Sequence, residues 1–440
     1  MSELVRSLSL YDVIFSGYGY TVGADIFALI PYIARTGKQF TWLAFLIGGI
    51  IVLATALSYA RLNLEYPSND AEFTWIRESF KVPEEEVKDE TDRTRNKFVD
   101  IFATVVIWAV MVMGVTMNSV MVVSINRFLK RYNINIPDIV LNFLIVLVPF
   151  AFNLLDAKNL SKSNIIVTIL TTIILVMIPA FAFKKSPHLS DVHISKNDFN
   201  KDSILNLIRA IGITILPYNG YQSVVQMSEE VKDTDDVPRG MMISGTLTIL
   251  AYCSLAVAVI AILGLAKTGK STSPLADIFK MFLGERGGNI ANLVGILTGF
   301  TTLLLSFYSR SRLLSKISEY GIAPSIFSKL GVDTGNNKLL SGIPFFSLVV
   351  IGIFTYFATV IREDALEVLT DITNVLTCFI FVCVNLGVLV NYFKKDNKVD
   401  KPDSEKTLMD RLREMPPYYA VLGLIIFAVL LYYGIIHFGK

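Results

Sequence analysis

Long apolar runs recur along this 440-residue chain, and short polar stretches separate them. A bilayer core about 30 Å thick requires roughly 20 mainly apolar residues in each helix that crosses it. Continuous runs such as 139–152 and 165–183 are expected to be helices, because lipid offers no partner to the open edge of a strand. The pattern predicts an all-α multi-pass membrane protein with about eleven spanning helices, near residues 11–36, 40–60, 99–126, 136–156, 163–183, 203–227, 239–266, 287–312, 342–361, 366–393 and 416–438.

The composition supports the same class of protein. Hydrophobic residues make up 53% of the chain and charged residues 18%, and the mean hydropathy is +0.54, a balance that an ordinary soluble domain would not tolerate. Lys and Arg concentrate in two loops, 61–97 and 394–413. Because cytoplasmic loops collect these residues, the N-terminus is predicted to be cytoplasmic. Acids match the bases within 81–97, which argues against a nucleic-acid partner.

Two of the expected spans contain residues that interrupt helices. The first has glycines clustered between positions 17 and 23, followed by Asp25 at membrane depth, and the sixth contains Pro217 and Gly220. Five spans separate these interruptions, so they occupy matched places in two halves of five helices. In inverted-repeat transporters, paired interruptions of this kind mark the binding site at the bilayer midplane, where the freed backbone groups meet a ligand.

Each interruption also has a structural explanation. Glycine provides close-packing surfaces in membrane helices, and a proline can kink a helix without any ligand. Asp25 favours the functional interpretation, because an ionisable residue inside a span costs several kcal/mol. A span that begins later than expected would instead place Asp25 nearer the surface.

At these residues the chain resembles the amino acid–polyamine–organocation permeases. Val22-Gly-Ala-Asp-Ile-Phe27 is similar to the helix-1 motif of that superfamily, and the segment from Leu57 to Trp75 is similar to the end of its helix 2. Tyr218-Asn-Gly-Tyr221, with the acidic and basic residues of 228–239, resembles helix 6 and its exit. The segment from Ser311 to Pro324 resembles the end of helix 8. The resemblance extends from about residue 10 to residue 393.

The resemblance implies a five-plus-five inverted-repeat core over residues 1–393, with repeats near 11–183 and 203–393. Residues 394–440 would then form a cytoplasmic linker and one peripheral spanning helix. The implied activity is secondary active transport of amino acids or related amines by alternating access. The substrate site of the family uses exposed backbone of helices 1 and 6, which corresponds here to Val22, Gly23, Ala24, Asp25, Ile26, Tyr218, Asn219 and Gly220.

Three departures from the family pattern qualify this expectation. Asp25 stands where glycine is usual and favours a cationic substrate or a coupled proton. Thr171 stands where some relatives carry a lysine that replaces sodium, so coupling to H⁺ or Na⁺ stays open. The family commonly has twelve spans rather than eleven. Thr302 and Ser306 are four residues apart and share a face of the eighth span, which makes Ser306 a candidate for substrate binding and Thr302 a candidate for ion coupling.

Other classes of function receive little support from the sequence. The spans contain no nucleophile paired with a base and no cluster of metal ligands, so we expect neither an enzyme nor a cofactor. The alternatives kept open are a transporter of polyamines or other organic cations and a membrane sensor or scaffold that has lost transport. The expected partners are a small-molecule substrate and the lipid bilayer. The sequence leaves a partner subunit and the particular membrane open.

Overall fold

The computed structural model describes residues 9–68, 70–154, 158–220, 225, 231–233, 235–330, 343–360, 365–394, 406 and 408–437. These ranges are almost wholly helical and contain no β-strand. In chain order the helices are α1 (Leu10–Thr21), α2 (Ala24–Gly37), α3 (Thr41–Glu65), α4 (Ala71–Phe80), α5 (Glu90–Lys130), α6 (Asp138–Asn153), α7 (Lys158–Lys184), α8 (Lys201–Tyr218), α10 (Asp236–Leu263), α11 (Leu265–Lys270), α12 (Pro274–Glu319), α13 (Phe345–Thr359), α14 (Ala365–Lys394), α15 (Leu408–Glu414) and α16 (Tyr418–His437).

The helices confirm an all-α multi-pass membrane protein. Among the described residues, seven helical segments are long and apolar enough to cross a membrane: Asp25–Glu65, Glu90–Lys130, Ile166–Lys184, Asp236–Leu263, Pro274–Glu319, Ala365–Lys394 and Tyr418–Ile436. The shorter apolar helices α6 and α13 coincide with two further expected spans. The expected span 203–227 is described only as far as residue 220, apart from Val225. The division into two inverted repeats and a C-terminal unit stays a prediction.

Local sequence determines where several of these helices begin and bend. Asp89 precedes α5, and its carboxylate accepts a hydrogen bond from the Asp92 N–H at 3.0 Å, which caps the helix. The charged turns that follow extend α5 beyond the expected span 99–126. Pro274 occupies the first turn of α12, where the N–H that proline lacks would have no partner. Gly284, at a φ of 71°, kinks α12 shortly before the expected span 287–312.

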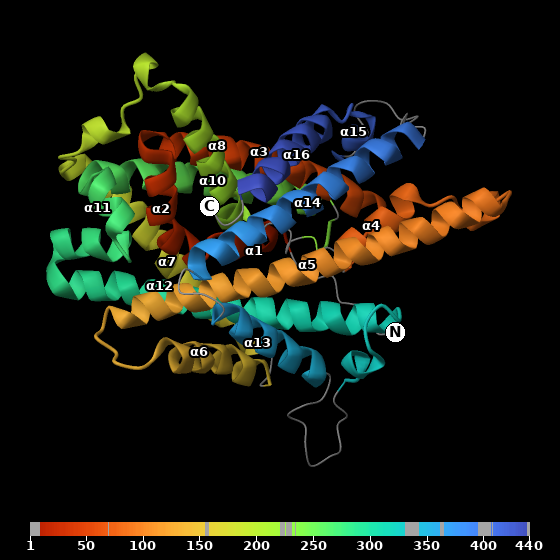
Figure 1. The fold of residues 1–440 in the computed structure, drawn as a ribbon, viewed down its shortest axis with the longest axis horizontal. Coiled ribbons are helices and arrows are strands. Elements are labelled where there is room, and N and C mark those ends of the chain that lie inside the picture. The colour runs from red at the N-terminus through yellow and green to blue at the C-terminus, as the bar shows by residue number, and fades with distance from the viewer. Residues whose placement is uncertain are drawn as a thin grey trace, which may run out of the picture.

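The long helices lie side by side in one bundle (Figure 1). α5 packs against both α12 and α14, while α3 packs against α10 and α8. Figure 1 shows α4 at one end of the long axis and α11 at the other. These are called the α4 end and the α11 end below. Large apolar side chains such as Phe143, Ile173, Phe354 and Ile425 are exposed on the outer helices, as a lipid environment requires.

The last helix is fastened to the bundle by buried polar contacts. Arg61 of α3 is 2% exposed and donates to the carbonyls of Arg413 at 3.0 Å and Met415 at 3.2 Å, in the segment before α16. Asn385 of α14 accepts from Ser58 at 2.6 Å and faces Gly423 of α16. These contacts join α16 to α3 and α14.

Candidate functional site

The first expected interruption is a short gap between α1 and α2. α1 ends at Thr21 and α2 begins at Ala24, so only Val22 and Gly23 are non-helical. The gap is narrower than the expected break over Val22–Asp25, because Asp25 already lies in the first turn of α2. Val22 and Ile26 are buried at 1% and 0% exposure, and the side chain of Ala24 lies outside the described residues. The C-terminal end of α1 and the N-terminal end of α2 therefore meet inside the bundle.

The second interruption ends α8. The helix continues through Pro217 and ends at Tyr218, one residue after the proline. Proline lacks the N–H that bonds back one turn, so the ladder weakens there and the chain turns within two residues. Asn219 is extended, at a ψ of 136°, and Gly220 has a φ of 144°. Residues 221–224 lie outside the described part of the chain.

The two interruptions touch. A Cβ atom built on Gly220 would lie 2.6 Å from the carbonyl oxygen of Tyr20 and 2.7 Å from Cα of Thr21. Only glycine permits this approach, and only glycine adopts a φ of 144° without strain. The structure therefore brings Gly220 against the last turn of α1, as expected for paired interruptions. The hydroxyl of Tyr252, from α10, donates to the carbonyl of Thr21 at 2.9 Å, and the same oxygen accepts from the Gly23 N–H at 3.0 Å, so α10 holds the end of α1.

Asp25 is the only acid at this contact within the described residues. Its side chain is 1% exposed, and its Oδ1 accepts from the N–H of Ile26 at 2.9 Å. No Lys or Arg of the described chain forms an ion pair with it. A buried carboxylate without a counter-charge is costly unless a cation, a proton or solvent accompanies it.

Asn219, which precedes Gly220, provides a second buried acceptor. Its side-chain N–H₂ group donates to Thr377 Oγ1 of α14 at 3.0 Å, and this bond turns the amide oxygen away from Thr377. The amide oxygen is buried and has no hydrogen-bond partner in the described structure. Tyr218 is 3% exposed, and its hydroxyl donates to the Phe45 carbonyl at 2.8 Å, so it braces α8 against α3. Of these two side chains, Asn219 has the unused acceptor.

The candidate ion-coupling residues lie on α7 and α12. Thr171 and Thr298 hydroxyls are 2.6 Å apart, which joins the two helices. Thr302 donates to the carbonyl of Thr298 at 2.9 Å and lies beside Gly23 at the helix-1 gap. Ser306 is partly buried one turn further along α12, and no hydrogen bond connects it to the gap residues in the described structure. The structure thus brings Thr302 to the gap, whereas Thr171 and Ser306 stand further along their helices.

Beyond the gap, toward the α11 end, polar and charged side chains connect α2 to its neighbours. Arg35, from α2, forms an ion pair with Glu367 of α14 and donates to the carbonyl of Gly269 at 3.3 Å. One turn closer to the gap, the hydroxyl of Tyr32 donates to Asp371 at 3.3 Å. Both contacts connect α2 to α14.

A second charged cluster lies toward the α4 end. The hydroxyl of Tyr59, from α3, donates to Glu72 of α4 at 3.1 Å. Glu72 and Arg310 of α12 attract each other electrostatically. Arg310 lies flat against Gly114 of α5, where any larger side chain would collide with the guanidinium. This cluster joins four helices.

Sequence reasoning missed several of these residues. Tyr252 could have been suspected from the sequence, because it is a polar side chain inside an apolar span. Arg310 stands two residues before the end of the expected span 287–312, where arginine normally reaches the surface, so its packing against Gly114 is not evident from the sequence. The pairing of Arg35 with Glu367 joins residues 332 positions apart.

Little open space lies on one side of the gap. A cavity of about 10 Å³ beside the gap, between Thr21 and Tyr218, has room for at most one water molecule, so the site is closed on this side. Fold and site together define a class: a multi-pass helical membrane protein whose two interrupted helices meet at a buried polar centre, as in solute transporters.

The comparison with known families identifies the chain more closely. The family model described as "Amino acid permease" matches residues 8–438. The chain belongs to this family, which confirms the resemblance drawn from the helix-1, helix-2 and helix-6 motifs. The family and the similar proteins described next are transporters.

Similar proteins include two from Arabidopsis thaliana and one from Escherichia coli. "Cationic amino acid transporter 8, vacuolar" is 23% identical over 414 residues, which cover 89% of this chain and 64% of the relative. "Cationic amino acid transporter 1" is 22% identical over 427 residues, 92% of this chain and 66% of the relative. "Inner membrane transport protein YbaT" is 24% identical over 336 residues, 74% of this chain and 72% of the relative. The chain thus spans about two thirds of the plant relatives it matches.

Proposed function

We propose that the chain is a secondary active transporter that carries amino acids or related amines by alternating access, with a preference for cationic substrates. The observation that carries this proposal is Asp25, which is 1% exposed beside the meeting point of the two helix interruptions and has no counter-charge among the described residues. The plant relatives named as cationic amino acid transporters support the same substrate class.

The proposed recognition follows from the charges of helix ends. The first amides of α2 carry a partial positive charge, and those other than the Ile26 N–H, which donates to Asp25, suit a substrate carboxylate. The last carbonyls of α1 suit an ammonium group. Asp25 and the unused Asn219 oxygen add acceptors for a second amino group. A cationic amino acid would use both sets, whereas a polyamine has no carboxylate and would leave the α2 amides unused.

Alternating access would proceed by opening one charged cluster at a time. With the N-terminus cytoplasmic, the α11 end faces outside and the α4 end faces the cytoplasm. Parting Arg35 from Glu367 would open the outer path, and parting Glu72 from Arg310 would open the inner path. Coupling to H⁺ would use Asp25, and coupling to Na⁺ would use Thr302 with carbonyls of the helix-1 gap.

The test is uptake into proteoliposomes that contain the purified protein. We expect uptake of labelled lysine or arginine to exceed that of leucine, and unlabelled substrate to compete with it. Uptake of spermidine without uptake of amino acids would favour the organic-cation alternative. Substrate-dependent thermal stabilisation without any flux would mean a sensor of the same fold and would overturn the transport proposal.

The variant Asp25→Asn tests the role of the carboxylate. Loss of cation binding with an unchanged pH dependence would indicate direct recognition. Retained exchange with loss of proton-driven uptake would indicate coupling. Unchanged affinity, selectivity and pH profile would contradict both roles and remove the main support for a cationic substrate.

A further inference from the structure

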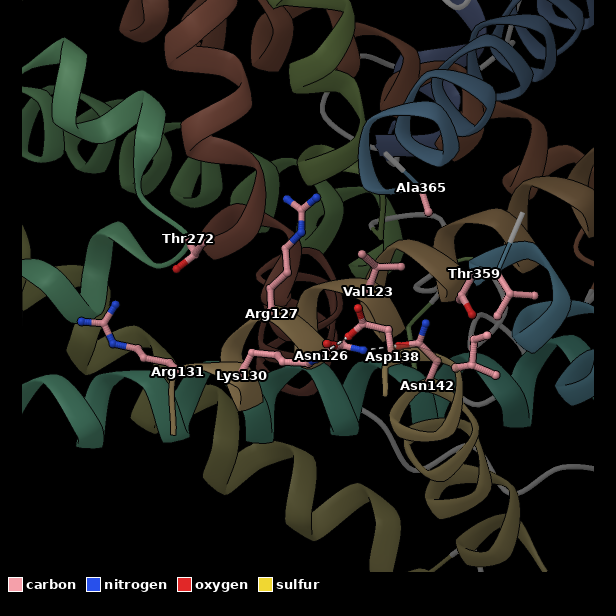
Figure 2. A pocket seen from close by; sticks show the side chains of 12 residues that line it. Val123, Asn126, Arg127, Lys130, Arg131, Asp138, Asn142, Thr272, Thr359 and Ala365 are labelled. Atoms are coloured by element: carbon pink, nitrogen blue, oxygen red, sulfur yellow. Dashed lines mark hydrogen bonds and ion pairs between the residues drawn. The ribbon is translucent and has the colours of Figure 1, made fainter. Parts of the chain in front are cut away.

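A separate cavity opens at the α11 end, away from the helix interruptions. Its volume is about 660 Å³, and residues from α5, α6, α13 and the start of α14 surround it. Figure 2 shows the side chains that line it: Val123, Asn126, Arg127, Lys130, Arg131, Asp138, Ile139, Asn142, Thr272, Thr359, Val360 and Ala365. Three of these are cations and one is an acid, so the described part of the lining carries a net positive charge.

The three cations differ in what they contact. Lys130 pairs with Asp138 at 2.9 Å, and Arg131 pairs with Asp277 at 2.7 Å. Arg127 has neither a hydrogen bond nor an ion pair within the part of the chain that the structure describes. In Figure 2 its guanidinium points away from Lys130 and Asp138. Arg127 is partly buried, so it has lost part of its hydration without gaining a direct partner.

The cavity also offers neutral donors beside this charge. Asn126 donates to the side-chain oxygen of Asn142 at 2.6 Å, which joins α5 to α6. With its oxygen engaged, Asn142 still has its own N–H₂ group as a donor. Ile139 and Val360, at 60% and 37% exposure, form an apolar edge toward the lipid.

We infer that this cavity is a binding site for an oxyanion, a carboxylate or phosphate group that Arg127 holds through its planar fork of N–H donors. Guanidinium groups bind such ligands bidentately. The apolar edge admits a phospholipid headgroup, and the volume admits a free anionic solute. Oxyanion binding at this cavity does not require that the chain transports amines.

Arg127 in this cavity interacts electrostatically with the ion pair of Arg35 and Glu367. Glu367 and Arg35 are the charged groups that act on Arg127, the first by attraction and the second by repulsion. Glu367 is therefore shared between Arg35, with which it pairs, and Arg127. An oxyanion bound to Arg127 neutralises that guanidinium, so Glu367 then interacts with Arg35 alone. Occupancy of the cavity thus strengthens the closed contact between α2 and α14.

Two arms of one experiment identify the source of the anion. In the first, the protein in phosphatidylcholine nanodiscs is titrated with inorganic phosphate or acetate at constant ionic strength, and its thermal unfolding is followed. In the second, phosphatidylglycerol replaces part of the lipid and no free oxyanion is added. Stabilisation in the first arm indicates a free solute, and stabilisation in the second indicates a headgroup. Absence of stabilisation in both overturns the inference.

Matched variants assign the site to Arg127. Arg127→Gln should abolish the stabilisation, whereas Arg131→Gln removes the same charge from an arginine that is already paired and should change the affinity by less than about threefold. Arg127→Lys keeps the charge without the fork and should bind about tenfold more weakly. Glu367→Gln removes the competing carboxylate and should raise the affinity severalfold. Equal binding in the wild type and in Arg127→Gln or Arg127→Lys would refute the assignment.

Discussion

Replacing Gly220 with alanine should separate the two helix interruptions. The new Cβ would lie 2.6 to 2.8 Å from backbone atoms of Tyr20 and Thr21, closer than real Cβ contacts allow, and backbone cannot rotate away as a side chain can. Overpacking of this kind costs about 1–3 kcal/mol. The φ of 144° adds strain of about 1–3 kcal/mol for any residue with a Cβ. The described conformation should therefore lose roughly 2–6 kcal/mol.

Gly212, in the same helix, provides the matched control. A Cβ there meets nothing within 4 Å, so Gly212→Ala should be neutral or stabilising by about 0.5–1 kcal/mol. Thermal unfolding of both variants in detergent, together with uptake into proteoliposomes, measures the difference. If Gly220→Ala unfolds and transports like the wild type, the close approach of α8 to α1 is refuted, and with it the geometry of the proposed site.

Three further predictions concern other parts of the bundle. Arg310→Met should cost about 3 kcal/mol of stability by leaving Glu72 without its counter-charge, and adding Glu72→Gln should recover part of that loss; equal losses in the single and double variants would show that the two residues do not interact. Gly423→Leu should cost about 1–3 kcal/mol, because a Cβ there lies 2.9 Å from the Asn385 side chain, whereas Val421→Leu on the exposed face of α16 should be neutral; thermal unfolding separates them. Finally, a cysteine at Glu85, in a variant that lacks the native cysteines, should react with an impermeant reagent only after cells are opened; labelling of intact cells would invert the assigned topology.

The spans could be predicted from the sequence because bilayer thickness fixes the length of an apolar helix. Both interruptions could be located as well, because glycine and proline act on the backbone of their own helix. Their boundaries differed by a residue or two. Asp25 is helical because α2 begins as soon as Gly23 has turned the chain. Pro217 is helical because the φ of proline fits a helix, and the chain leaves the helix at Asn219, whose ψ is 136°.

The contacts around the site could not be predicted in the same way. The hydroxyl of Tyr252 reaches Thr21 across 231 positions of the chain, and Arg35 reaches Glu367 across 332. Such pairs depend on how whole helices cross, which no local pattern contains. The sequence does not single out Arg127 either, because Lys130 and Arg131 follow it in the same charged helix end. Only the structure shows that Lys130 and Arg131 form ion pairs, whereas Arg127 forms none with the described residues.

Burial of Asp25 constrains how the proposed transport cycle can run. At 1% exposure the carboxylate has lost its hydration, and backbone hydrogen bonds such as that from the Ile26 N–H do not replace a counter-charge. The conformation closed at both ends is therefore favourable in free energy when a cationic substrate or a proton neutralises Asp25. It is costly when neither is bound. On the proposed function, the charged clusters at the α4 and α11 ends should close together only around a neutralised Asp25. A carrier that cannot close empty exchanges one cation for another, whereas one that closes with a proton couples uptake to the proton gradient, so the ligand of Asp25 in the closed state decides which kind of transporter this chain is.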